Sequence, residues 1–454
     1  MTDREQIDPS IITRFQYFSS NEWQRRYQAV LESLEAEEID AFIVTSTENI
    51  FWLTGFQTTG YYFFQALVIS RVAEPFILTR QMENIGAITR TWLDNCYYYY
   101  DTQNPVEQLA YRILEIRDVR VIGYEKDSSL FPASYEEQLK KILSGYTFQN
   151  TRIVERLRKT KSHEELAVMN LAAKATEAGM LYGINLIKDM FKTSATTSTV
   201  LTSESESESA FDNRCLYTRL NNLIRDQKEN LDSNQLTVLD SLKMYLPQRE
   251  TFNENDIAAA IQYGATRAGG EYPACPPFVA SGPRGYIGHA TWEGREIKRG
   301  DIIFIEIGGC KYRYHTAMMR TVYVGSELPP IIKEAQDIIN ETLSTCMTEM
   351  KPGVPIYKID NLSKQIMNNN SFGYINHVRF GYSIGCAFSP GWGEDNVITI
   401  KGTEESPFEE GMVFHLIPFM MIPNIGTVGI SETVKITKEG AVSLFNFPRE
   451  IFTV

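Results

Sequence analysis

The chain has 454 residues, of which 43% are hydrophobic and 22% charged, so it can bury more than one hydrophobic core. Its formal net charge is -13, and so acidic a chain lacks the excess of Lys and Arg that binds phosphate backbones or anionic membranes. We therefore expect no nucleic-acid partner and no membrane partner, and no apolar run approaches the ~20 residues of a membrane span.

The features that bear on location favour the cytoplasm. The first ten residues, MTDREQIDPS, lack the basic and apolar regions of a signal peptide. The six cysteines are far apart and form no CxxC pair, which disfavours a disulfide framework or a structural zinc site. We expect free thiols in a reducing compartment.

The first part of the chain alternates between helical and extended patterns. Apolar residues recur at helical spacing over 21–39, and helical patterns return near 104–118 and 132–144. Between them lie short runs rich in Val, Ile and Phe that are typical of strands. Strands interleaved with helices predict an α/β domain over residues 1–155. The predicted strands are 41–46, 63–70, 75–79 and 120–125.

A long helix is predicted next, within 157–188, after a short linker. Ser162 is a suitable N-cap, and Glu164 and Glu165 follow in the first turn, where the helix dipole favours carboxylates. The second domain is therefore predicted to cover residues 156–454, with the boundary near 150–160.

An insertion of unusual composition interrupts the second domain at about 190–250. Its first part, TSATTSTVLTSESESESA (193–210), is low in complexity and rich in Ser, Thr and Glu. The stretch 216–246 has helical periodicity. We interpret the segment as a neutral insertion, with a lid or an interface as the alternative.

The rest of the chain reads as helices followed by many strands. Residues 253–270 predict a helix with a glycine stop, and 329–350 and 356–370 predict two more. Residues 301–325 predict two strands joined by a turn near Gly308–Gly309. With 412–422 and 432–437 as further strands, the pattern predicts an antiparallel sheet with helices on one side, an α+β domain.

An ordered series of segments resembles a known family. NENDIAAAI, REIKRGDIIFIEIGG, YHTAMMRT, GYSIG, EEGMVFHLIPF and SETVKITKEG occur in that order. They are similar to the pita-bread fold of creatinase and the Xaa-Pro aminopeptidases, and the first domain resembles the small creatinase-type domain that precedes it. The resemblance covers nearly the whole chain apart from 190–250, and it implies an enzyme with a pita-bread catalytic domain.

Peptidases of this family bind two metal ions through two Asp, one His and two Glu. Most of those ligands are replaced here, and we expect no metal and no other cofactor, because side chains of this kind make a poor site for divalent ions. The matching positions are Glu306, Ala317, Tyr382, Ile417 and Ser431.

Creatinase hydrolyses a C–N bond without a metal, and GHATWEGR (288–295) places His289 where that enzyme has its proton-transfer histidine. The glutamate that creatinase carries before Arg-Thr is Met319 here, which argues against a creatinase-type guanidinium clamp. HATWEGR, GYSIG followed by PGWGED, and GMVFHLIPF are more similar to the metal-independent subgroup that includes ectoine hydrolase. That resemblance implies hydrolysis of an amidine, guanidino or amide C–N bond in a small polar or zwitterionic molecule.

Three residues are predicted to be catalytic. His289 can move a proton near neutral pH. Glu306 lies in an apolar strand, where burial would raise its pKa unless an arginine such as Arg313 or Arg320 pairs with it. It is a nucleophile, a base on water or an anchor for a cationic substrate. His415 lies on another predicted central strand, with a satisfied core histidine as its alternative role.

The remaining candidates would line the substrate pocket. Glu394 follows Trp392 in a loop, which suits a mobile carboxylate at a pocket mouth. In related dimers a loop such as 54–64 reaches into the neighbouring subunit, so we expect a homodimer whose N-terminal domain contributes to the neighbour's site. The predicted substrate-binding residues are Phe56, Tyr61, Tyr62, Tyr314, His315, Arg320, Tyr382, Trp392, Glu394 and Glu432.

Two other functions remain open from the sequence. One is a metal-dependent Xaa-Pro aminopeptidase or dipeptidase with an unusual site, against which Ala317, Ile417 and Ser431 argue. The other is a catalytically inactive pita-bread binding protein, against which the retention of His289 and Glu306 argues.

Overall fold

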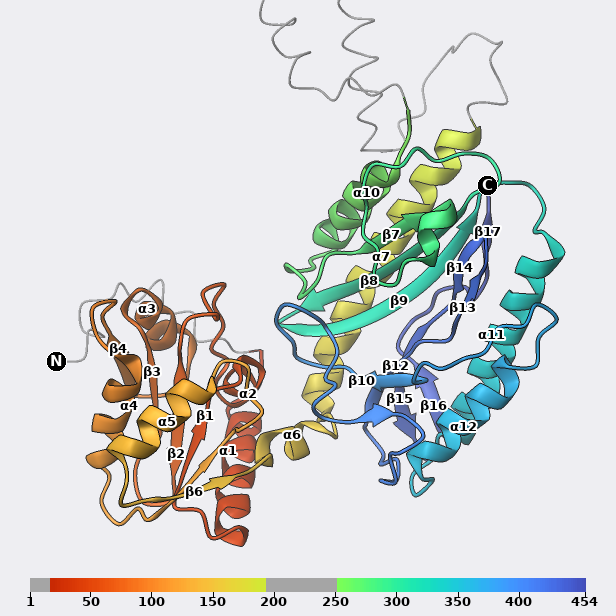
Figure 1. The fold of residues 1–454 in the computed structure, drawn as a ribbon. Coiled ribbons are helices and arrows are strands. Elements are labelled where there is room, and N and C mark those ends of the chain that lie inside the picture. Colours follow the sequence, from red (N-terminus) through yellow and green to blue (C-terminus); the bar gives the residue numbers. More distant parts are fainter. Residues whose placement is uncertain (1–16, 193–250) are drawn as a thin grey trace, which may run out of the picture.

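The computed structural model describes residues 17–192 and 251–454. These residues form a smaller N-terminal domain and a larger C-terminal domain, joined through the short helix α6, Ile153–Arg158 (Figure 1). Nearly all of the predicted insertion, including 193–210 and 216–246, lies outside the described residues.

The N-terminal domain is built on one mixed six-stranded sheet with the order β4-β3-β2-β1-β5-β6. β1 pairs antiparallel with β2 and parallel with β5, so the sheet combines hairpin and crossover connections. The α/β prediction is confirmed. The elements are α1 Ser20–Ala36, β1 Ala41–Val44, α2 Thr47–Thr54, β2 Ala66–Ser70, β3 Phe76–Arg80, α3 Gln81–Arg90, β4 Asn95–Tyr99, α4 Pro105–Leu114, β5 Val121–Tyr124, α5 Ala133–Ile142 and β6 Thr147–Asn150.

The C-terminal domain has the α+β architecture expected of a pita-bread fold. Its strands form sheets with the orders β17-β9-β8-β7, β11-β10-β12-β15-β16 and β13-β14. The elements are α7 His163–Lys192, α10 Glu254–Arg267, β7 Phe278–Ser281, the 3-10 helix η4 Gly282–Tyr286, β8 Ile302–Lys311, β9 Tyr314–Tyr323, α11 Pro330–Glu349, α12 Ile356–Met367, β10 Gly381–Ser383, β11 Thr399–Ile400, β12 Val413–Leu416, β13 Phe419–Ile422, β14 Gly426–Gly429, β15 Glu432–Thr437, β16 Gly440–Ser443 and β17 Phe452–Thr453.

Two helix pairs flank these sheets. α7 and α10 pack together, and α7 also contacts β8 and β9, whereas α11 and α12 pack together beside the second half of the domain (Figure 1). Apolar side chains fill both contacts, for example Met180 and Ile261 on the first pair and Ile339 and Ile359 on the second. The strands that carry the candidate residues are therefore supported by helices on both flanks.

The long helix α7 begins as the sequence predicts. The backbone N–H of Glu165 donates to Ser162 Oγ at 3.2 Å, and the backbone N–H of Ser162 donates to Glu165 Oε2 at 2.9 Å. This reciprocal pair satisfies two amide groups that the first turn of a helix leaves without partners.

The predicted turn at Gly308–Gly309 is wrong, because both glycines lie inside β8. The hairpin turns instead at Tyr312 and Arg313, whose φ values of 48° and 61° match the right-handed twist of the flanking strands. Close packing against other segments explains the two glycines. A Cβ on Gly308 would lie 2.5 Å from the ring of Trp392, and the backbone N–H of Gly309 donates to Thr176 Oγ1 at 3.0 Å.

The apolar run 412–422 forms two strands in different sheets. β12 ends at Leu416 and β13 begins at Phe419, with Ile417 and Pro418 between them. Proline cannot donate to a strand ladder, so the run is interrupted there. β12 pairs with β10 and β15, whereas β13 pairs with β14 alone.

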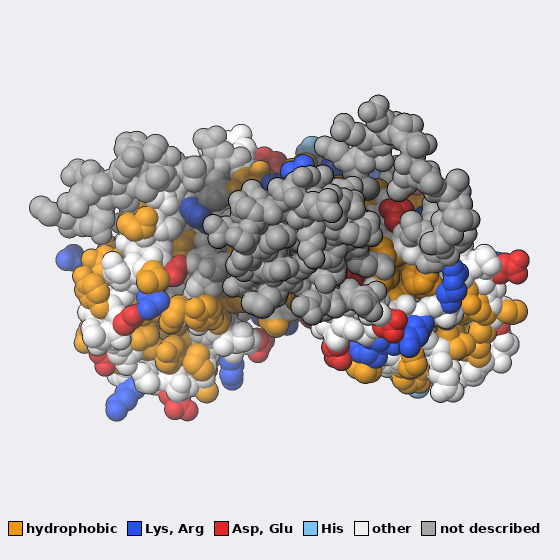
Figure 2. Space-filling view, turned by 90° about the horizontal axis from the view of Figure 1, so that it is seen from above, with side chains coloured by type: hydrophobic (Ala, Val, Ile, Leu, Met, Phe, Trp, Pro, Cys, Tyr) orange, Lys and Arg blue, Asp and Glu red, His pale blue; other side chains and the backbone are white. Residues whose placement is uncertain are grey.

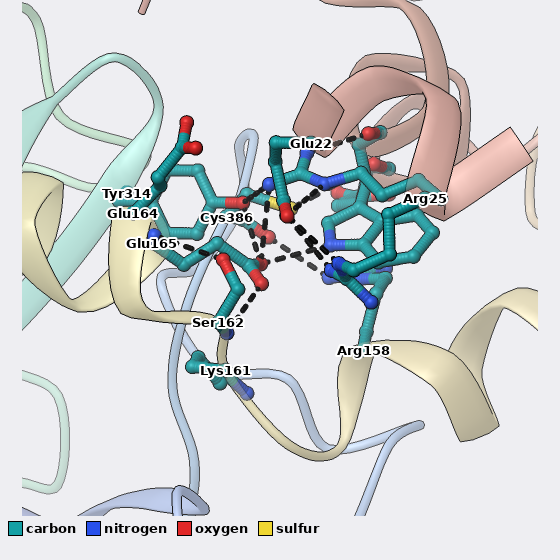
Figure 3. Close-up of polar contacts among 12 residues, drawn as sticks. Glu22, Arg25, Arg158, Lys161, Ser162, Glu164, Glu165, Tyr314 and Cys386 are labelled. Carbon is teal, nitrogen blue, oxygen red and sulfur yellow. Dashed lines mark hydrogen bonds and ion pairs between the residues drawn. The ribbon is translucent and has the colours of Figure 1, made fainter. Parts of the chain in front are cut away.

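A buried polar network joins the two domains (Figure 3). Glu165 at the start of α7 accepts hydrogen bonds from Trp52 Nε1 at 2.8 Å and from the Tyr314 hydroxyl at 2.7 Å, and Arg26 Nη2 lies 3.7 Å from it. Arg26 also pairs with Glu22 at 2.8 Å. All of these side chains are buried, so the junction is stable only while each buried charge keeps its partners.

The described surface carries mixed charges. On the part of the upper face that Figure 2 shows in colour, Lys and Arg side chains are interspersed with Asp and Glu and do not gather into an extended basic area. Among the helices in the described ranges, none is both long enough and apolar enough to cross a membrane.

We predict that Arg26→Met destabilises the protein by about 3–5 kcal/mol, because it leaves Glu165 buried without its ion-pair partner, whereas Glu22 keeps Arg25. The matched control is Arg112→Met, which removes an exposed pair with Glu115 and is expected to cost less than about 1 kcal/mol. Urea unfolding of both variants measures the difference. Equal losses would contradict the assignment of the junction as a buried charge network.

Candidate active site

The candidate site is centred on Glu306, in the middle of β8. Its register partners are Met319 on β9 and Phe278 on β7, and side chains directly opposite one another point to the same face of a sheet. Glu306 is thus flanked on both sides by apolar side chains on one face of the sheet.

The carboxyl group of Glu306 is buried, and no Lys or Arg of the described residues forms an ion pair with it. Its side chain is 6% exposed, and burial raises its pKa to about 8. The two arginines considered as partners are engaged elsewhere: Arg313 donates to the backbone oxygens of Ala387 and Tyr272, and Arg320 pairs with Glu432. Glu306 can therefore gain or lose a proton near neutral pH, as a general acid or base requires.

Trp392 covers Gly308, which is two residues from Glu306 on β8 and faces the same side of the sheet. Its ring packs over Gly308, and its Nε1 donates to the Tyr382 hydroxyl at 3.0 Å. Trp392 is 4% exposed. The indole fixes the position of the phenol oxygen from one side.

A hydrogen-bonded chain runs from Tyr382 through His415 to Ser431. The Tyr382 hydroxyl lies 2.8 Å from His415 Nδ1, and Ser431 Oγ lies 2.7 Å from His415 Nε2. Tyr382 and His415 are register partners on β10 and β12, so both point to the same face. Burial, reinforced by the positive charges of Arg379 and Arg320, lowers the pKa of His415 to about 3, so its imidazole is neutral at physiological pH.

Electrostatics connect the phenol of Tyr382 with Glu306. Burial raises the pKa of Tyr382 well above its usual value, and the negative charge of Glu306 acts in the same direction. The phenol therefore keeps its hydrogen and offers a donor in the neighbourhood of the carboxyl group.

His289 lies at the rim of this group. It is exposed, and it has a φ of 59°, which is uncommon for a residue other than glycine. Its ring centroid lies 5.5 Å from that of Phe278, which is itself 5.5 Å from Trp392. Phe278 thus lies between the exposed imidazole and the buried residues, and it is also the register partner of Glu306.

Glu394 does not lie at a pocket mouth as a mobile carboxylate. It is 2% exposed and accepts from Arg158 at 2.6 Å, from Lys161 at 2.7 Å and from Ser383 at 2.9 Å. Burial alone would raise its pKa, but Lys161 and Arg158 outweigh that effect and hold the pKa below its usual value. Glu394 is an ionised anchor between the domain linker and β10.

Three further candidates lie in structural contacts. Tyr314 donates to Glu165 in the domain junction (Figure 3). Arg320 and Glu432 form a buried ion pair at 2.8 Å, and Arg320 also donates to the backbone oxygens of Ser431 and Pro448. These contacts use the polar groups that were expected to bind substrate.

The remaining candidates are one histidine and three aromatic residues of the loop 54–64. His315 is fully buried; its Nε2 accepts from the backbone N–H of Ala274 at 3.0 Å, and burial lowers its pKa well below the usual value. Phe56 is 1% exposed, Tyr61 packs 5.5 Å from the ring of Phe388, and Tyr62 is 66% exposed.

The donor set does not fit a divalent metal ion. Of the five positions that hold ligands in the related peptidases, Ala317 and Ile417 have no donor atom in their side chains, and the hydroxyls of Tyr382 and Ser431 are hydrogen-bonded to His415. Glu306 is then the one carboxylate. Within residues 17–192 and 251–454, no group of three or more His, Cys, Asp or Glu side chains is placed to hold a metal.

Sequence reasoning missed the roles of Phe278 and Ser431. Phe278 carries no chemical signal, and only the register of β7 with β8 places it beside Glu306. Ser431 stood out only as a replaced metal ligand. Its hydrogen bond to a histidine 16 residues away was not visible in any local pattern.

A shallow depression lies elsewhere on the C-terminal domain. It has a volume of about 520 Å³ beside the start of α11 and shares no residue with the group around Glu306. Its lining is a mixture of apolar side chains and exposed charges without a convergent set of polar groups, so we do not regard it as the site. The lining residues are Leu328, Pro330, Lys333, Glu334, Asp337, Ile338 and Glu341.

Two family models match the chain. The creatinase/prolidase N-terminal domain matches residues 26–160, and metallopeptidase family M24 matches residues 237–438. Together they account for about three quarters of the chain. The chain is 27% identical to ectoine hydrolase of Halomonas elongata over 449 residues, which covers 96% of this chain and 98% of that protein.

Peptidases are also similar. The Xaa-Pro dipeptidase of Pyrococcus horikoshii is 31% identical over 199 residues, which is 44% of this chain and 54% of that protein. The crystal structure of the prolidase from the same organism has a TM-score of 0.69 at 20% identity and covers 94% of this chain and 100% of that chain. The X-Pro aminopeptidase of Thermotoga maritima gives 0.67 at 19%, covering 93% and 100%. These structures establish the fold.

We predict that the stability gap between the wild type and Glu306→Gln depends on pH. The folded state raises the pKa of Glu306 from 4.5 to about 8, so the group's contribution to stability is full below about pH 4.5 and is lost as the pH rises through about 8. The wild type should therefore lose stability relative to Glu306→Gln between about pH 5 and pH 9, by on the order of a few kcal/mol.

Urea unfolding of both proteins across this range measures the gap. Glu125, whose pKa burial also raises to about 8, titrates in both proteins, so its effect cancels in the difference. A gap that does not change with pH would show that Glu306 is ionised throughout.

Proposed function

This chain is a member of metallopeptidase family M24 with a creatinase/prolidase N-terminal domain, and from that membership we propose a metal-independent hydrolase of a small polar molecule. The family membership and the full-length similarity to ectoine hydrolase support a hydrolase of C–N bonds. The finer proposal concerns the bond and the mechanism: an amidine, guanidino or amide C–N bond of a zwitterionic or cationic substrate, cleaved without a metal.

One observation carries this proposal. Glu306 is a buried carboxyl group that pairs with no cation of the described residues, and it lies near the hydrogen-bonded chain of Tyr382, His415 and Ser431. Glu306, Tyr382 and Ser431 match positions of metal ligands in the related peptidases. A buried carboxylate is stabilised by a group that brings both positive charge and N–H donors, as an amidinium or a guanidinium does. Such substrates supply the positive charge that no described side chain brings to Glu306.

The positions of the residues support the roles that we propose for them. His289 is exposed at the rim, where its imidazole is accessible to solvent, and we assign the proton-transfer role to it. Glu306 acts as nucleophile, as base on water or as anchor for the substrate cation. Tyr382, held by Trp392, donates in this proposal to an oxygen that gains negative charge during hydrolysis.

A metal-dependent Xaa-Pro dipeptidase is the second candidate. The similarity to the dipeptidase of Pyrococcus horikoshii and the fold of the prolidases favour it. Ala317 and Ile417 argue against it, because they place apolar side chains where that chemistry needs carboxylates. A catalytically inactive binding protein is the third candidate, and a turnover measurement separates it from both enzymes.

We further propose a cytoplasmic homodimer in which the N-terminal domain contributes to the neighbour's site. The exposure of Tyr62, in the loop that was expected to reach the neighbouring subunit, supports this arrangement. The free thiols Cys96, Cys275, Cys310, Cys346 and Cys386 support a reducing compartment.

We predict that His289→Ala lowers turnover by about 10²–10⁴-fold, the usual contribution of a general acid or base, with little change in melting temperature because the side chain is exposed. Substrates are first identified by thermal stabilisation with ectoine, creatine, guanidino acids and Xaa-Pro dipeptides. The matched control is His377→Ala, an exposed histidine on another loop, which should keep wild-type turnover.

Steady-state kinetics on the wild type and both variants decide the outcome. Equal turnover of His289→Ala and His377→Ala would remove His289 from the mechanism. Hydrolysis of Xaa-Pro dipeptides, with none of any amidine, guanidino compound or small amide, would favour the peptidase.

A further inference from the structure

The chain of Tyr382, His415 and Ser431 lies between two groups that can only donate. Trp392 Nε1 donates to the Tyr382 oxygen at 3.0 Å, and the backbone N–H of Met319 donates to Ser431 Oγ at 2.6 Å. Neither donor can accept a hydrogen in return. The hydroxyl hydrogens of Tyr382 and Ser431 must therefore point toward His415 or out of the chain.

Counting hydrogens shows that one is left over. A neutral imidazole carries one N–H, and burial of His415 lowers its pKa to about 3, so the chain holds three hydrogens: one phenolic, one imidazole and one on the serine. Its two links, from Nδ1 to Tyr382 and from Nε2 to Ser431, use one hydrogen each. One hydroxyl hydrogen is free to leave the chain.

Only two arrangements satisfy both links. If Nδ1 carries the hydrogen, His415 donates to the Tyr382 oxygen and accepts from Ser431, and the Tyr382 hydrogen is free. If Nε2 carries it, His415 donates to Ser431 and accepts from Tyr382, and the Ser431 hydrogen is free. The position of the imidazole hydrogen thus decides which end of the chain can donate.

We propose that His415 is a positioning residue whose tautomer selects whether Tyr382 or Ser431 offers the site's one free hydroxyl hydrogen. This inference rests on the proposed function only for the role of that hydrogen, which is to bind an acceptor oxygen of the substrate. The arrangement of the hydrogens in the protein alone does not depend on it.

The surroundings favour Tyr382 as the donor when substrate is bound. The Tyr382 hydroxyl accepts from Trp392, whose ring covers Gly308 two residues from Glu306 on β8, whereas Ser431 is fully buried with its oxygen against the backbone of Met319. The substrate class that fits has an N–H-rich cation for Glu306 and a carbonyl or carboxylate oxygen for the Tyr382 hydroxyl. Such a ligand selects the Nδ1–H form.

The test uses two variants that remove opposite ends of the chain. In Tyr382→Phe, a hydrogen on Nδ1 would have no acceptor, so it should reside on Nε2 and donate to Ser431. In Ser431→Ala, a hydrogen on Nε2 would have no acceptor, so it should reside on Nδ1 and donate to Tyr382. An unsatisfied buried donor is disfavoured enough to shift the tautomer population by roughly tenfold.

Nitrogen-15 NMR of protein labelled at histidine reads the tautomer without substrate. The chain has five histidines, and the signals lost in His415→Asn identify those of residue 415. His377→Asn, at an exposed position, is the matched control and should leave the signals of His415 unchanged. We expect the two end variants to place the hydrogen on different ring nitrogens.

Two results would overturn the proposal. One is the same tautomer in Tyr382→Phe and Ser431→Ala. The other is a wild-type His415 that is cationic near pH 7, because a second imidazole hydrogen would free both hydroxyl hydrogens. This measurement on the wild type decides the outcome even if a variant does not fold. Neither result depends on turnover, so failure of this inference is distinguishable from failure of the proposed function.

Discussion

Side-chain hydroxyls bind the backbone of β9 to the segment that runs from β14 into β15, and this seam holds the two main sheets of the C-terminal domain together. Thr433 Oγ1 accepts from the backbone N–H of Ala317 and donates to its carbonyl oxygen, both at 2.9 Å. Thr321 Oγ1 forms the same kind of pair with Gly429, at 2.9 and 3.0 Å. Ser431 Oγ accepts from Met319 N between them.

This seam also determines what the site contains. The hydroxyl of Ser431 belongs both to the seam and to the chain through His415, so the imidazole is held relative to β9 and, through it, to Glu306 on β8. The same small side chain that joins the sheets stands where a metal-binding glutamate would be in the related peptidases. A larger carboxylate there would lose the bond to Met319 and place a second buried negative charge near Glu306.

A second constraint acts on Trp392 from the domain junction. Glu394, two residues further along, is held by Arg158 and Lys161 from the linker, and its backbone N–H donates to Ser383 at 2.7 Å. Arg158 also donates to Asn49 of the N-terminal domain at 2.6 Å. The loop that carries the indole N–H is therefore fixed by the charges of the linker, and Arg158 connects it through Asn49 to the N-terminal domain.

The sequence predicts elements whose cause is local. The reciprocal bonds of Ser162 and Glu165 follow from a four-residue pattern, and the apolar run of β8 places Glu306 in a buried strand. The hairpin turn was misplaced because its two residues, Tyr312 and Arg313, carry no turn signature. The glycine pair on which the predicted turn rested is explained by close contact with Trp392 and Thr176, which lie in distant segments.

The site was predicted only in part for the same reason. The apolar strand contexts of Glu306 and His415 indicate burial, but the raised pKa of Glu306 and the lowered pKa of His415 depend on partners that only the structure shows. The partners of Glu394 and Tyr314 come from residues 233 and 149 positions away, in the linker and in α7. No local pattern indicates such contacts, so both side chains were predicted to bind substrate although the structure uses them in the junction.

We infer that a site in the fold of the metal-dependent peptidases works here through carboxyl, phenol, imidazole and serine groups alone. The most direct measurement is turnover of the purified protein after exhaustive dialysis against EDTA, with metal content determined on the same sample. We predict full activity at far less than one metal ion per chain, and no gain on adding Mn²⁺, Co²⁺ or Zn²⁺. Loss of activity on chelation with recovery on adding one of these ions would contradict the account.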